Sequence, residues 1–189
     1  MRKVFLTVSV AAILVLGLSA CSSATTSQKT PKTTPPSTNT APTQQVFTAV
    51  IAPLNNSGVN GEATVTVDGT SLQVEISAAG MVPGKPHAQH IHGLSGKAST
   101  SPPTDSTTLI PEAKAESYYG QVLVPLLPFP MASATGATTY SASVEASSAV
   151  PGTPVLPLAG RGIVLHGLIV NGTYDPSMPV GFGVLTLKP

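Results

Sequence analysis

The chain has 189 residues, nine of them Lys or Arg and eight Asp or Glu, so its formal net charge is +1. This charge is too close to zero to indicate nucleic acid or an anionic surface as a partner. Aromatic residues make up only 4% of the chain and Trp is absent, which argues against a carbohydrate-stacking platform. Thr, Ser, Pro, Gly, Ala and Val dominate, and this composition favours an all-β fold with many turns.

Residues 1–20 have the layout of a secretory signal peptide. Arg2 and Lys3 form a basic start, an apolar run follows, and small residues precede Cys21. The segment 18–21, Leu-Ser-Ala-Cys, resembles the lipobox of bacterial lipoproteins, in which the cysteine is acylated and becomes the first residue. The resemblance implies an extracytoplasmic protein anchored to the bacterial cell membrane, with the lipid bilayer as a partner through acylated Cys21. The alternative is an ordinary cleaved signal peptide that happens to end at a cysteine.

Residues 21–45 are expected to form a lipidated, disordered tether. They are rich in Ser, Thr and Pro and show no apolar periodicity, so they cannot bury a core. Cys21 is the only cysteine of the chain, so no intramolecular disulfide can form. Residues 46–189 are long enough for a single domain with a sizeable core.

Period-2 alternation of apolar and polar residues, bounded by turn residues, predicts strands across the domain. The expected strands are 47–52, 63–67, 72–77, 87–92, 121–126, 138–145, 162–166 and 181–187. Asp68-Gly69 lies between two of them and predicts a hairpin. Residues 94–117 are polar and are expected to form a long irregular loop. Seven or eight short strands with no helical run indicate a β-sandwich or a Greek-key β-barrel.

All four histidines lie in two short stretches, His87, His90 and His92 in the first and His166 in the second. In a strand, His90 and His92 project from the same face with Cα atoms about 6.6–7 Å apart. That spacing lets two imidazoles converge on one metal ion, and imidazole is a common ligand of zinc and copper. His166 would complete a set of three ligands, and His87 is expected to hold a ligand ring by hydrogen bonding. The alternative is a group of surface or half-buried histidines that binds no metal.

The same stretches resemble copper/zinc superoxide dismutases. Residues 80–93 are similar to the strand that carries the copper site, 160–166 to the segment that brings a later copper histidine, and 183–185 to the closing strand. Residues 119–124 and 171–175 also resemble dismutase-like secreted proteins of bacteria, which are often confused with chordin-type domains. The resemblance implies a superoxide dismutase-like Greek-key β-barrel. It also implies that His90, His92 and His166 bind copper. His87 would support these ligands without binding the metal itself.

The sequence departs from the dismutase pattern where activity is concerned. Residues 94–118 contain no histidine, so the bridging histidine is missing and no zinc site of the dismutase type is expected. The family's active-site arginine would fall near Pro179, and its disulfide cannot form. Lys97 and Lys114 are the basic residues left in the loop that would attract superoxide, although lysines there are by default solvated.

These observations predict an exported, membrane-anchored lipoprotein whose dismutase-like domain binds copper. Superoxide, if it is a partner at all, is expected to be dismutated weakly or not at all, and no residue is assigned a catalytic role. The alternative is a non-catalytic surface module that keeps the barrel as a scaffold and uses its loops for binding, since the fold alone does not define the function.

Overall fold

The computed structural model describes residues 44–104 and 107–189, which belong to one compact unit. The predictions for the signal peptide, for Cys21 and for most of the tether lie outside the described residues. Within the described part of the chain, no helix is both long enough and apolar enough to cross a membrane.

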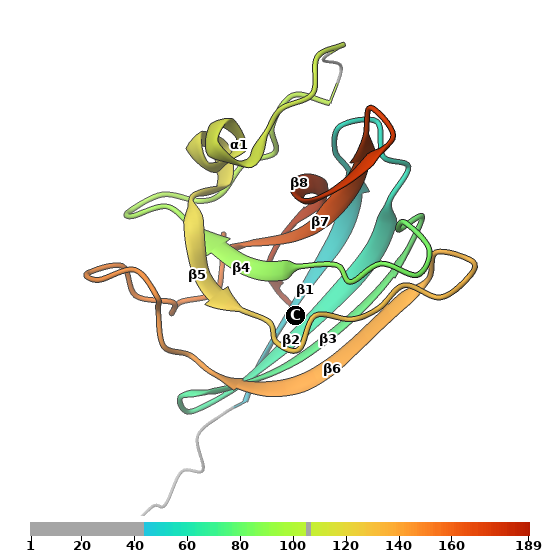
Figure 1. Ribbon diagram of the computed structural model, residues 1–189. Coiled ribbons are helices and arrows are strands. Elements are labelled where there is room, and N and C mark those ends of the chain that lie inside the picture. The colour runs from blue at the N-terminus through green and yellow to red at the C-terminus, as the bar shows by residue number, and fades with distance from the viewer. Residues whose placement is uncertain (1–43, 105–106) are drawn as a thin grey trace, which may run out of the picture. The chain divides into compact units, whose positions relative to one another are not determined.

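The described fold is all-β, as the sequence predicts, with a single short helix among its strands (Figure 1). The elements are β1 (Gln45–Pro53), β2 (Asn60–Asp68), β3 (Ser71–Ala79), β4 (Gln89–Gly93), α1 (Glu112–Tyr119), β5 (Gln121–Pro125), β6 (Thr138–Glu145), β7 (Gly162–Val170), β8 (Thr173–Val184) and β9 (Thr186–Leu187). The strands form one antiparallel sheet in the order β5-β4-β7-β8-β1-β2-β3-β6, and β9 pairs with β1. Figure 1 shows this sheet curling into a half-barrel.

Strands β1, β2 and β3 follow the predicted alternation of buried and exposed residues. Every second side chain is buried, among them Phe47 in β1, Val65 in β2 and Val74 in β3. The predicted hairpin joins β2 to β3 by pairing Asp68 with Ser71. Gly69 in its turn has a φ of 60°, which glycine adopts at little steric cost.

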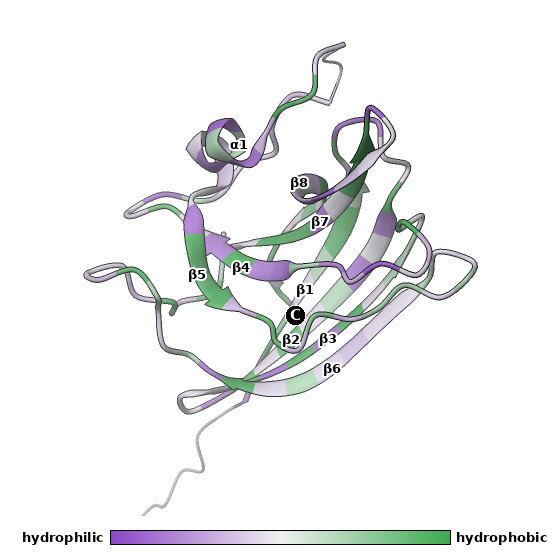
Figure 2. Cartoon of the chain, viewed as in Figure 1, coloured by the Kyte–Doolittle hydropathy of each residue, from purple (hydrophilic) through white to green (hydrophobic). Residues whose placement is uncertain are grey.

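The core fills the concave side of the curled sheet. Its main cluster combines side chains of β1, β2 and β3 with Ile91 of β4, Leu123 of β5 and Ile163 of β7. Figure 2 shows that β5 is mostly hydrophobic, whereas β6 at the opposite edge is mostly pale. The exposed positions of β6 are polar, with Thr139, Ser141 and Ser143 among them. The half-barrel therefore buries one face and leaves the other to water.

One prediction is wrong, because residues 94–117 are not irregular throughout and α1 lies at their end. Helix α1 follows Pro111, which is suited to a helix start, and opens with Glu-Ala-Lys-Ala-Glu, all strong helix formers. Ala115 and Tyr119, four residues apart on one face, are buried in a second core cluster with Phe182. Lys114, expected in a loop, is therefore a helix residue, and its side chain is exposed.

Most strand boundaries differ from the prediction, and the differences in three strands bear on the site. Strand β4 begins at Gln89, so His87 precedes it. Strands β7 and β8 are longer than predicted because they form a hairpin closed by Asn171 and Gly172, whose φ values are 49° and 79°. An Asn-Gly pair with positive φ at both positions is favoured in two-residue hairpin turns. This hairpin places His166 opposite the second half of β8.

Candidate metal centre

Three histidines meet on the neighbouring strands β4 and β7. His90 and His92 project from one side of β4 while Ile91 between them packs into the core, as the alternation predicts. His166 comes from β7, which pairs antiparallel with β4 and has register shifts on both sides of His166. One ring nitrogen from each histidine lies within 4.8 Å of the other two. This is the one group of three or more His, Cys, Asp or Glu side chains in the described residues that is close enough to hold a metal ion.

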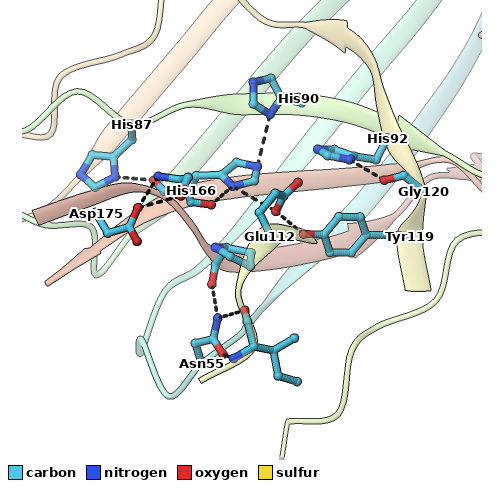
Figure 3. Close-up of polar contacts among 12 residues, drawn as sticks. Asn55, His87, His90, His92, Glu112, Tyr119, Gly120, His166 and Asp175 are labelled. Carbon is cyan, nitrogen blue, oxygen red and sulfur yellow. Dashed lines mark hydrogen bonds and ion pairs between the residues drawn. The ribbon is translucent and has the colours of Figure 1, made fainter. Parts of the chain in front are cut away.

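Main-chain carbonyls fix the orientation of two of the three rings (Figure 3). His92 Nδ1 donates to the oxygen of Gly120 at 2.9 Å, and His166 Nδ1 donates to the oxygen of Ser177 at 3.0 Å. A carbonyl oxygen only accepts, so in a neutral ring the Nε2 atom carries the free lone pair. His166 Nε2 lies 3.2 Å from His90 Nδ1, and His92 Nε2 is buried without a hydrogen-bond partner. The nitrogens of His92 and His166 that are left to bind a metal ion are therefore their Nε2 atoms.

Burial keeps these histidines neutral. Desolvation of the charged form lowers the pKa of His90 to about 4. It also lowers the pKa values of His92 and His166 to about 3, and repulsion from His90 adds to both shifts. The carbonyl contacts of Gly120 and Ser177 oppose the lowered pKa values but do not outweigh burial. At neutral pH all three rings are in the form that binds metal ions.

His87 supports His166 through the main chain and not, as predicted, through a ligand ring. Its Nδ1 lies 2.7 Å from the main-chain oxygen of His166 and its Nε2 lies 3.0 Å from that of Val82, while its ring packs edge-on against Tyr174 at 5.8 Å between centroids. Tyr174 in turn donates its hydroxyl to the main-chain oxygen of Pro86. His87 thus ties the segment before β4 to β7 at the position of the third histidine.

Two residues of α1 belong to the site although no motif of the sequence indicates them. Tyr119 packs edge-on against His92 at 4.8 Å between centroids and stacks on Phe182 at 5.7 Å. Its hydroxyl donates to Glu112 Oε2 at 2.6 Å, and the same carboxyl oxygen lies 3.6 Å from His166 Nδ1. The run of helix formers after Pro111 is the signal that would have placed Glu112 and Tyr119 on one helix.

Burial also shifts the pKa of the Glu112 carboxyl group. The pKa of Glu112 is raised to about 7, mainly by desolvation and also by nearby Glu116, while the hydrogen bond from Tyr119 acts in the opposite direction. Burial and the bond to Glu112 raise the pKa of Tyr119, so its hydroxyl keeps its proton. Because the imidazole of His166 is neutral at pH 7, its contact with Glu112 is not an ion pair there.

A cavity of about 310 Å³ leads to the histidines and has an acidic and apolar wall. It borders His90 and His166, and its wall includes the carboxyl groups of Glu112 and Glu116. Phe129, which packs edge-on against His90, contributes to the apolar part. The residues that line it include no Lys or Arg, so neither Lys97 nor Lys114 contributes to it.

Pro179 occupies the position in the sheet that the dismutase resemblance would give to an arginine. It pairs directly with His166 across β7 and β8. Arg161, which is mostly buried, instead donates to the carbonyls of Val155, Leu94 and Pro154 at 3.1, 2.9 and 2.6 Å. It therefore fastens two loops and does not provide a positive charge at the cavity.

Comparison with known proteins adds no family to this description. The sequence matches no family model and no curated protein. The functional assignment therefore rests on the geometry of the three histidines, which fit a metal ion without identifying it.

Proposed function

We propose that this protein is a lipid-anchored, extracytoplasmic copper-binding protein with a dismutase-like domain and with weak or absent superoxide dismutation. The observation that carries the proposal is the convergence of three neutral imidazoles, His90, His92 and His166, within 4.8 Å. A nitrogen-rich set of this kind suits copper and zinc, and the intrinsic affinity order of divalent metals favours Cu²⁺ over Zn²⁺ at a given site. Copper is therefore the metal that we assign.

The dismutase-like character is supported by the residues of the sheet that carry the site. His90 and His92 lie on β4 and His166 on the adjacent strand β7, so the stretches that carry the resemblance meet at one site. The contact of His87 with the main chain of His166 links the two stretches directly, so His87 also belongs to this site.

The charge around the cavity supports weak or absent dismutation. Superoxide is an anion, and fast capture of an anion needs a positive field at the entrance. The cavity wall instead carries Glu112 and Glu116, and the position opposite His166 is Pro179. A metal cation is attracted by this wall, whereas superoxide is repelled whenever the carboxyl groups are ionised.

Copper content tests the proposal directly. Full-length protein exported by a bacterial host is expected to bind about one copper per chain in competition with an excess of zinc, as the three-histidine set implies. The variant with His90→Ala and His92→Ala is expected to lose this copper, while Lys97→Ala, which alters an exposed side chain outside the cavity, is expected to keep it. Equal copper content of the wild type and the double variant would show that the histidines are not a copper site.

Two further measurements test the remaining parts. Superoxide is expected to decay no faster with the copper-loaded wild type than with the double variant, and a large acceleration would contradict the weak-activity proposal. Radiolabelled fatty acid is expected to be incorporated by the wild type and not by Cys21→Ser. Incorporation by both would contradict the lipid anchor.

A further inference from the structure

The starting observation is a pair of buried polar atoms that lack partners beside the same site. Three buried side-chain polar atoms of the described residues have no hydrogen-bond partner, namely Gln89 Nε2, His92 Nε2 and Glu112 Oε1. Such an atom has lost its hydration without gaining a replacement, so each calls for an explanation. The His92 atom is one of the three convergent nitrogens. The Glu112 atom belongs to the carboxyl group next to them.

The position of Glu112 Oε1 is set by what its carboxyl group touches. The other oxygen, Oε2, accepts the Tyr119 hydroxyl at 2.6 Å and lies 3.6 Å from His166 Nδ1, the nitrogen that donates to Ser177 and not the one that faces His90. Tyr119 is itself held between His92 and Phe182. Figure 3 shows the carboxyl group pointing to the space between the rings of His166 and His92.

We propose that Glu112 Oε1 is the fourth ligand of the metal, which gives a centre of three imidazoles and one carboxylate. This inference rests on the proposed function, since it needs a metal at the three histidines. A carboxylate supplies negative charge to a site that three neutral rings leave uncharged. Coordination also gives a partner to the buried Glu112 Oε1, which otherwise has none. Because oxygen ligands are hard, they favour a divalent cation over Cu⁺. Glu112 therefore makes the centre selective for Cu²⁺.

Glu116 provides the matched comparison on the same helix. It follows Glu112 by four residues, so both lie on one helix face, and both border the cavity. The contact with the His166 ring and the bond from Tyr119 belong to Glu112. If Glu112 acted only through its negative charge, substitutions of Glu112 and Glu116 would lower the Cu²⁺ affinity to a similar extent. If Glu112 coordinates the metal, its substitution would have the larger effect.

The test compares Cu²⁺ and Cu⁺ affinities of the full-length wild type, Glu112→Gln and Glu116→Gln, measured by chelator competition. Glu112→Gln is expected to lower the Cu²⁺ affinity by at least about 10-fold, the smaller of the losses seen when a residue that tunes a bound metal is removed. Its Cu⁺ affinity is expected to change much less, and its Cu²⁺ electron paramagnetic resonance spectrum is expected to change. Glu116→Gln removes charge from the cavity wall but no ligand, so it is expected to lower the Cu²⁺ affinity much less than Glu112→Gln does and to leave the spectrum unchanged.

The failures of the two proposals are distinguishable. Loss of copper in the double histidine variant, together with wild-type Cu²⁺ affinity and an unchanged spectrum in Glu112→Gln, would overturn the role of Glu112 and leave the copper site. In case Glu112→Gln does not fold, the wild type labelled with ¹³C at glutamate carboxyl groups is titrated with Zn²⁺ as a diamagnetic probe. The Glu112 resonance is expected to shift more than that of Glu116, and equal or absent shifts would overturn the inference.

Discussion

Gly167 and His87 approach each other so closely that no side chain fits between them. A β-carbon on Gly167 would lie 2.6 Å from His87 Nδ1, which contacts the main-chain oxygen of His166, and even closer to the hydroxyl oxygen of Tyr174. The φ of Gly167 is 112°, a value that strains any residue with a β-carbon. The residue after the third histidine is thus glycine for two reasons, its backbone conformation and the space that His87 needs.

Gly167→Ala is expected to destabilise the protein by more than the strain alone, which is about 1–3 kcal/mol. The added methyl group would also displace Tyr174 and His87, and with His87 the main chain of His166, so copper affinity is expected to fall. Chemical unfolding and chelator competition measure the two effects. Gly172→Ala is the control, because Gly172 has a φ of 79° but a β-carbon added there would meet no other atom within 4 Å. Equal losses in both variants would show that the contact with His87 is unimportant.

Tyr119→Phe is expected to keep the stacking on Phe182 and lose the bond to Glu112. That bond lowers the pKa of Glu112, so its removal is expected to raise this pKa above its value of about 7. The free energy of unfolding is expected to fall by about 1–3 kcal/mol, as for other buried acceptors that lose their donor. Carboxyl ¹³C titration and urea unfolding test both, with Tyr118→Phe as control. A Glu112 pKa that is unchanged or lower would contradict the assigned hydrogen bond.

The metal-free protein is expected to lose stability as the pH falls from 7 to 4.5. The three histidines have folded-state pKa values of about 3 to 4, below the unfolded value of about 6.5, so the unfolded chain takes up more protons in this range. Glu112 acts in the opposite direction, because its raised pKa adds stability at low pH that is lost as the pH rises through about 7. The effect of three histidines on the free energy of unfolding is larger than that of one carboxyl group, so stability falls on acidification. Glu116 is the other carboxyl group at the cavity.

Urea unfolding of metal-free protein at several pH values between 4.5 and 7 measures this dependence. The variant with His90→Gln and His92→Gln is expected to show a weaker dependence, because two of the groups that resist protonation are gone. A wild-type midpoint that is constant across this range, or that rises on acidification, would contradict the prediction.

Asn55→Asp is expected to loosen the segment that leads into α1. The Asn55 amide donates to the carbonyls of Ile110 and Pro179 at 3.0 and 2.9 Å, and its oxygen accepts from Ile110 N at 2.7 Å. A carboxylate cannot donate, so two carbonyls lose their partner at a cost of about 1–3 kcal/mol each. Thermal unfolding measures the loss, and Asn56→Asp is the control, because Asn56 also has a positive φ but is exposed. A larger loss in Asn56→Asp would contradict this role of Asn55.

The strands were predictable because their signal is local. Alternation places Phe47, Val65 and Val74 on the buried face whatever the rest of the chain does. The shared face of His90 and His92 follows from the same rule. Helix α1 was missed because only Ala115 and Tyr119 are buried on it, which leaves little apolar periodicity to detect.

The remaining parts of the site depend on contacts between distant parts of the chain. Glu112 lies beside His166 because α1 packs over the β7–β8 hairpin, and no spacing within residues 94–118 indicates that. Asn55 joins Ile110 and Pro179, which are 55 and 124 positions away. Such contacts become visible when the sheet order is known.

The anchoring of the two buried imidazoles to main-chain carbonyls also bears on how fast a bound ion would leave. His92 cannot turn without breaking its bond to Gly120 at the end of α1, and His166 cannot turn without breaking its bond to Ser177 in β8. The bond of His92 is buried and that of His166 is partly buried, so rotation of either ring would break a bond that water replaces poorly. The residence time of the metal would then be set by local opening of these two segments, and the centre would act as a slow-exchanging store.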